Sequence, residues 1–115
     1  MNHVTTVTKP PLNFNQIQSE YAAKSPRQIL EFALEKFDNI AISFSGAEDV
    51  VLIDMASKIT KNFQVFSIDT GRLHSETYRL FEKVRQRYDI ELEILFPDAK
   101  QVEKLVKEKG LFSFY

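Results

Sequence analysis

The sequence predicts an α/β domain built on a parallel sheet. Short apolar segments alternate with longer ones whose apolar residues recur every three or four positions, the pattern of strands followed by helices. Connections long enough for one helix imply parallel strands joined by right-handed crossovers. A chain of 115 residues, 43% of them hydrophobic, has the size of one domain with one core.

The amino-terminal part divides into a lead and two helices. Residues 1–11 carry little hydrophobic pattern, so we expect a flexible lead before a domain that covers residues 12–115. Residues 12–21 predict a short helix. A second helix is predicted from Ser25 to about Lys36, because its opening SPRQ has a capping serine, a proline at the first helical position and a glutamine that completes a capping box.

Three strand-helix units follow these helices. We expect strands at residues 40–44, 63–68 and 91–95, and helices at residues 49–59, 75–88 and 98–110. Asp98 is expected to cap the last helix together with Gln101, and Gly110 to end it. This order predicts a Rossmann-like parallel sheet with helices on both faces.

Composition and charge exclude several classes of protein. Fifteen Lys and Arg against sixteen Asp and Glu give a net charge of -1, so no positive field gathers nucleic acid or an anionic membrane. The absence of cysteine excludes a disulfide, a thiolate metal site and thiol catalysis within this chain, and we predict no metal site or catalytic residue in it. Without a signal peptide or a long apolar run, we expect a cytoplasmic protein.

The first candidate site is the loop after the first predicted strand. Ligands of open parallel sheets bind beyond the carboxyl ends of the strands, where backbone amides and a positive helix end meet. A phosphate or sulfate group would suit this loop, and a glycine in it lets the backbone approach an oxyanion. Two acids at the helix start equally favour simple helix capping, so both interpretations stay open. The candidate residues are Ser43, Phe44, Ser45, Gly46, Ala47, Glu48 and Asp49.

The second candidate site is the loop after the next strand. It offers an aspartate at a strand end, a turn, and an arginine able to contact phosphate through two parallel hydrogen bonds. The alternative is an ordinary turn in which Asp69 and Thr70 bond to backbone and Arg72 is solvated. The candidate residues are Ile68, Asp69, Thr70, Gly71 and Arg72, whereas His74 shows no catalytic signature.

Four segments in order resemble assimilatory adenylyl-sulfate reductases, or the related phosphoadenylyl-sulfate reductases. They are SFSGAEDVV at residues 43–51, FSIDTGRL at 66–73, ETYR at 76–79 and KEKGLFSFY at 107–115. The resemblance implies an adenine nucleotide alpha-hydrolase-like fold, with the first loop by the phosphosulfate and the second strand end by the adenosine. SGAED and DTGRL, in place of SSSFG and DTGYL, favour adenylyl sulfate over its 3'-phosphorylated form.

The resemblance also implies chemistry that this chain lacks. In the family a cysteine thiolate attacks the sulfate sulfur, AMP leaves, and a thioredoxin- or glutathione-type reductant releases sulfite. The full-length protein is expected to carry a [4Fe-4S] cluster as well. With no cysteine, this chain is expected to be a truncated amino-terminal fragment that supplies nucleotide binding only; self-association into a homo-oligomer is left open.

Two other interpretations remain beside this one. The chain is alternatively a non-catalytic α/β nucleotide-binding or regulatory module, which the missing cysteine and the acids of the first loop favour. A related ATP-pyrophosphatase or sulfate-adenylylating subunit ranks last, because such proteins more often have an SGGKDS-like loop.

Overall fold

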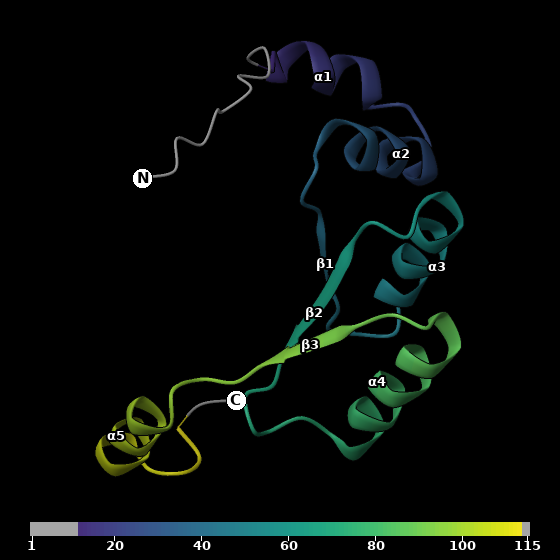
Figure 1. Cartoon of the computed structure of the whole chain (residues 1–115). Coiled ribbons are helices and arrows are strands. Elements are labelled where there is room, and N and C mark those ends of the chain that lie inside the picture. Colours follow the sequence, from purple (N-terminus) through teal and green to yellow (C-terminus); the bar gives the residue numbers. More distant parts are fainter. Residues whose placement is uncertain (1–11, 114–115) are drawn as a thin grey trace, which may run out of the picture.

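The computed structural model describes residues 12–113, and its elements agree with the predicted order (Figure 1). The predicted lead at residues 1–11 lies outside the described residues. Among residues 12–113, no helix is both long and apolar enough to cross a bilayer. The elements are α1 (Phe14–Tyr21), α2 (Pro26–Lys36), β1 (Ala41–Ser43), α3 (Asp49–Ile59), β2 (Gln64–Ile68), α4 (Ser75–Tyr88), β3 (Leu92–Leu95) and α5 (Ala99–Lys109).

The three strands form one parallel sheet in the order β1-β2-β3, which confirms the predicted α/β class. Ser43 lies opposite Phe66, and Ile68 lies opposite Leu95. The carboxyl ends of all three strands therefore meet at one edge of the sheet, and β2 reaches further along that edge than β1. This edge is where the two predicted loops begin.

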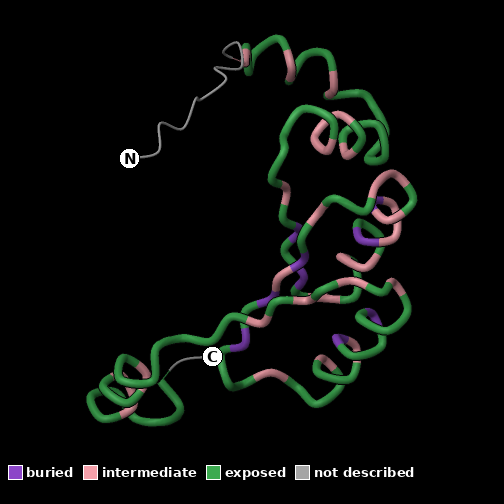
Figure 2. The backbone as a smooth tube through the Cα atoms, viewed as in Figure 1, coloured by how far each residue is buried: buried purple, intermediate pink, exposed green. Residues whose placement is uncertain are grey.

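One face of the sheet is covered and the other is open within residues 12–113. Ile42, Val65 and Ser67 are buried, whereas the alternating neighbours Ala41, Gln64 and Ile68 are exposed. Figures 1 and 2 show α3 and α4 together on one side of the strands, where the buried positions gather. The expected helices on both faces are thus found on one face only in the described part of the chain.

The core joins this sheet face to α3 and α4. Its buried apolar side chains are Ile42, Phe44, Ile53, Ala56, Val65, Phe81 and Val84. A polar contact also joins the two helices, because the Tyr88 hydroxyl donates to Asp54 Oδ1 at 2.9 Å. Lys58 pairs with the other oxygen of Asp54 at 3.0 Å, and these two contacts, the lysine first, lower the pKa of Asp54. The shared core and this tyrosine-aspartate bond therefore join the two helices.

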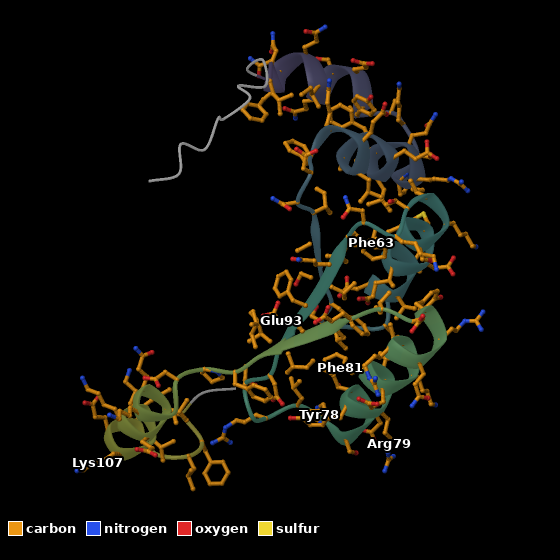
Figure 3. The ribbon with its side chains drawn as sticks, viewed as in Figure 1. Phe63, Tyr78, Arg79, Phe81, Glu93 and Lys107 are labelled. Carbon is orange, nitrogen blue, oxygen red and sulfur yellow. The ribbon has the colours of Figure 1, made fainter. Side chains whose placement is uncertain are left out.

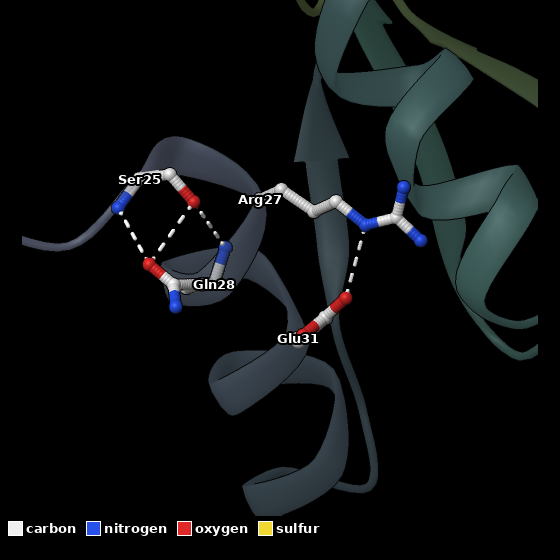
Figure 4. Close-up of polar contacts among 4 residues, drawn as sticks. All are labelled: Ser25, Arg27, Gln28 and Glu31. Carbon is white, nitrogen blue, oxygen red and sulfur yellow. Dashed lines mark hydrogen bonds and ion pairs between the residues drawn. The ribbon is translucent and has the colours of Figure 1, made fainter.

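The capping box predicted for α2 is present (Figure 4). The Gln28 amide donates to Ser25 Oγ at 3.2 Å, and the Ser25 amide donates to Gln28 Oε1 at 3.0 Å. The two capping-box bonds satisfy amides that the first turn of a helix leaves without partners. Arg27, in the same turn, pairs through Nε with Glu31 Oε1 at 3.0 Å.

The start of α5 differs from the prediction. Asp98 occupies the N-cap position and its carbonyl accepts the Val102 amide, but its side chain makes no cap hydrogen bond. The end agrees with the prediction, because Gly110 has a φ of +79° and its amide donates to the Val106 carbonyl. Figure 1 shows α5 standing apart from α3 and α4, beyond the carboxyl end of β3.

Candidate functional site

Both predicted loops leave the same edge of the sheet from neighbouring strands. The sheet bonding continues into each loop: the Phe44 amide donates to the Phe66 carbonyl at 2.8 Å, and the Asp69 amide donates to the Leu95 carbonyl at 2.9 Å. The first residue of each loop is therefore anchored to the adjacent strand. Parallel α/β proteins bind ligands at this kind of edge.

The loop between β1 and α3 is organised by the carboxylate of Asp49. Asp49 Oδ2 accepts the Ser45 amide at 2.7 Å, the Gly46 amide at 3.0 Å and the Ser45 hydroxyl at 3.1 Å. The bonds from the two amides, Ser45 first, lower the pKa of Asp49. Two amides that we expected to be free for an oxyanion are thus already bonded to a carboxylate of the chain.

The two acids of this loop have different roles. Glu48 is at the N-cap position of α3 but makes no cap hydrogen bond through its side chain, whereas Asp49 binds the preceding loop. Simple capping of α3 by these acids is therefore not observed. Gly46 has no positive φ, and a Cβ atom there would come no closer than 3.5 Å to Glu48 Oε2. The chain itself does not require glycine at this position.

The loop between β2 and α4 is organised by the carboxylate of Asp69. This side chain is buried, with 7% of its residue surface exposed. Its Oδ1 accepts both the Gly71 amide at 2.7 Å and the Tyr78 hydroxyl at 2.8 Å. Gly71 has a φ of +82°, a conformation that favours glycine. The predicted Asp69-backbone turn is confirmed, and a tyrosine completes it.

A hollow of about 330 Å³ opens beside this turn. The turn forms one wall, and the segment from the end of β3 to α5 forms the other. Its residues are Asp69, Thr70, Gly71, Phe96, Pro97, Ala99, Val102 and Glu103. Most of its walls are apolar, and its two ionisable side chains are acidic. The hollow therefore suits an uncharged group that donates hydrogen bonds, rather than an anion.

A larger hollow, of about 930 Å³, lies between α1 and α2. It contains no residue of the two strand-end loops. We place the candidate site at the smaller hollow, because position at the carboxyl edge of a parallel sheet is a better guide to a ligand site than volume.

Aromatic side chains connect the two loops through α4. Phe44, at the start of the first loop, packs against Phe81 with ring centroids 5.0 Å apart. Phe81 in turn meets Tyr78 edge to face at 6.4 Å. Figure 3 shows Tyr78 and Phe81 on the side of α4 toward the strands and Arg79 on its outer side. The row Phe44, Phe81, Tyr78 and Asp69 therefore runs from one loop to the other.

The predicted site residues divide by where the structure places them. Asp69, Thr70 and Gly71 line the hollow, and Ser45, Gly46 and Asp49 form the bonded first loop. Phe44 is fully buried, so its side chain belongs to the core and only its backbone remains for a ligand. Ile68 lies on the open sheet face, 57% exposed. Ser43, Ala47, Glu48 and Arg72 are exposed.

Sequence reasoning missed Tyr78, Phe96 and Pro97. Tyr78 falls in the ETYR segment of the helix predicted at residues 75–88, and its hydroxyl among the apolar residues of that helix was the available signal. Phe96 and Pro97 follow the third strand, a place equivalent to the two candidate loops.

The next question is whether the chain has ligands for a metal ion or an iron-sulfur cluster. Among residues 12–113, no group of three His, Cys, Asp or Glu side chains is placed to hold a metal ion. The whole sequence contains no cysteine, so its residues do not fit the thiolate set of a [4Fe-4S] cluster. The site offers hydrogen-bonding groups and apolar surface.

Comparisons with known proteins agree with this architecture. The chain is 57% identical over 106 residues to adenosine 5'-phosphosulfate reductase of Pseudomonas aeruginosa, covering 91% of this chain and 40% of that protein. It is 53% identical over 104 residues to 5'-adenylylsulfate reductase 3, chloroplastic, of Arabidopsis thaliana, covering 90% and 23%. The chain thus spans well under half the length of these curated relatives. Residues 39–115 match the phosphoadenosine phosphosulfate reductase domain, and the chain belongs to that family.

Proposed function

We propose that this chain is the nucleotide-binding part of a sulfate-assimilation reductase that acts on adenylyl sulfate. The observation that carries the proposal is the hollow at the carboxyl edge of the sheet, lined by the Asp69-Thr70-Gly71 turn. Family membership supports the substrate class, since the relatives named above are adenosine 5'-phosphosulfate and 5'-adenylylsulfate reductases.

The nucleoside would occupy the hollow. Phe96 and Pro97 offer apolar surface for a base, and Asp69 and Glu103 offer carboxylate oxygens to ribose hydroxyls or to base amino groups. The same carboxylates disfavour the charged phosphosulfate, which would extend toward the first loop and Arg72. To bind that group, the Ser45 and Gly46 amides would have to exchange the Asp49 carboxylate for an oxyanion of the ligand.

Reduction itself would belong to residues outside this chain. The whole enzyme would convert adenylyl sulfate to sulfite and AMP with a thioredoxin- or glutathione-type donor, or the 3'-phosphorylated substrate to adenosine 3',5'-bisphosphate. The nucleophile of that reaction is a cysteine, which this chain lacks, so we expect no turnover by the chain alone. A [4Fe-4S] cluster of the whole enzyme would likewise need other residues, and a cytoplasmic location stays a prediction.

A non-catalytic nucleotide-binding or regulatory module is the second candidate. The Asp49 carboxylate favours it, because this group already occupies two amides of the first loop and would compete with an anionic ligand. Such a module would bind a nucleoside or AMP as well as it binds adenylyl sulfate.

Calorimetric titration of the folded chain tests the proposal. Adenylyl sulfate is compared with its 3'-phosphorylated form and with AMP, after circular dichroism has shown the chain to be folded. We expect adenylyl sulfate to bind most tightly and Arg72→Ala to weaken it about tenfold, the scale of a lost arginine-phosphate contact. Arg79→Ala removes the same charge from the outer side of α4 and should leave binding unchanged.

The outcomes separate the two candidates. Equal binding of AMP and adenylyl sulfate, without an effect of Arg72→Ala, would favour the non-catalytic module. A folded chain that binds none of the three nucleotides would refute a nucleotide site within these residues.

A further inference from the structure

Asp69 is a buried carboxylate whose position is set from two directions. A single oxygen, Oδ1, receives the Gly71 amide from within the turn and the Tyr78 hydroxyl from α4. A buried carboxylate left short of donors is costly, so both bonds hold the side chain in place. The turn that Asp69 opens forms a wall of the hollow.

Tyr78 is 39% exposed, and its ring has an aromatic neighbour in the core. It meets Phe81 edge to face, and Phe81 packs on the fully buried Phe44. The hydroxyl therefore extends from a 14-residue helix that packs on the core, whereas the turn that it reaches is short and contains a glycine. The hydrogen bond to Asp69 also raises the pKa of Tyr78 above its ordinary value.

We propose that Tyr78 is a positioning residue for the nucleotide site: through Asp69 it holds the Asp69-Thr70-Gly71 turn in the shape that binds the nucleoside. The inference rests on the nucleotide site proposed above and adds a residue that does not itself line the hollow. Through Phe81 and Phe44, the same side chain links the position of this turn to the start of the first loop.

The chain provides a matched control in Tyr88. Tyr88 also lies on α4, and its hydroxyl also donates to an aspartate, Asp54, at 2.9 Å. Neither Tyr88 nor Asp54 lines the hollow. Tyr78→Phe and Tyr88→Phe therefore remove the same atom and the same kind of bond, one beside the site and one away from it.

The test measures adenylyl sulfate binding and amide hydrogen exchange in both variants of the 115-residue chain. We expect Tyr78→Phe to raise the dissociation constant about tenfold, the scale of one lost bond to a charged group, and to speed exchange of the Gly71 amide. Tyr88→Phe should change neither, although both variants lose a similar amount of thermal stability.

Each other result counts against the inference. Unchanged affinity in Tyr78→Phe, or equal weakening in both variants, would overturn it while leaving nucleotide binding intact. A Tyr78→Phe chain that unfolds while Tyr88→Phe stays folded would assign Tyr78 to global stability instead. If the unmodified folded chain binds no nucleotide, the proposed function fails first, and the inference falls with it.

Discussion

Each of the two loops at the sheet edge is organised by one aspartate carboxylate. Asp49 gathers the Ser45 and Gly46 amides, and Asp69 gathers the Gly71 amide and the Tyr78 hydroxyl. The Asp69 turn could be predicted because its bond spans two residues, a short-range preference of aspartate. The bond from Tyr78 could not, because it depends on how α4 returns to the sheet. Asp49 was predicted near the site, but its sequence position does not show whether it caps α3 or turns back to the loop.

The ionised Asp49 carboxylate should stabilise the folded chain, and this stabilisation should be lost in acid. Its pKa is lowered in the folded state, so the stabilisation is present above the ordinary value of 3.8 and is lost as pH falls through the lower folded-state value. We expect Asp49→Asn to reduce the free energy of unfolding by about 1 kcal/mol at pH 6, the net scale of a lost hydrogen bond. Urea unfolding between pH 6 and pH 3 should show the two chains converging in acid.

Glu48→Gln is the control for this prediction. It removes the same charge from the adjacent residue, whose side chain makes no cap bond. If Glu48→Gln lost as much stability as Asp49→Asn, the effect would come from general charge at the helix start rather than from the bonded loop.

Local signals decided which helix ends could be predicted. The capping box of α2 is complete within four residues of sequence, and it is present (Figure 4). At α5 the residue types for a cap are present, but the Asp98 side chain does not make the bond. The chain leaves β3 there through Phe96 and Pro97, and α5 stands apart from the other helices (Figure 1). Residue type favours a cap, but the path of the chain decides whether the side chain reaches the amides.

Ser25→Ala should destabilise the chain through α2. It removes the acceptor of the Gln28 amide, so we expect the free energy of unfolding to fall by about 1 kcal/mol. Ser19→Ala makes the same change inside α1, where alanine is the better helix former, and should not destabilise the chain. Thermal unfolding followed by circular dichroism compares the two variants, and equal losses would contradict the capping account.

The whole molecule is a three-stranded sheet with one face covered. Strand-helix alternation predicted the parallel sheet, because each element has its own local pattern and the crossovers leave few topologies. It did not predict the open face: Phe66 and Ile68 have the apolar character of a strand buried on both sides, but only one side meets helices within residues 12–113. The hollow also required tertiary structure, since it joins residues 69–71 to residues 96–103.

Alanine substitutions of two phenylalanines should separate an effect on folding from an effect on nucleotide binding. Phe44 is fully buried in the small core, so Phe44→Ala should cost about 3 to 5 kcal/mol and leave little folded chain. Phe96 is 69% exposed and lines the hollow, so Phe96→Ala should keep the unfolding midpoint but weaken adenylyl sulfate binding. Urea unfolding and calorimetry measure the two effects, and a destabilised Phe96→Ala would place that side chain in the core instead.

An NMR titration of the isotope-labelled chain with adenylyl sulfate tests the proposed nucleotide site most directly. We expect the largest amide shifts at Ser45, Gly46, Thr70 and Gly71, with smaller ones at the residues around Phe96 and few in α1 or α2. Shifts gathered in the larger hollow between α1 and α2, or no shifts from a folded chain, would contradict a nucleotide site at the carboxyl edge of this sheet.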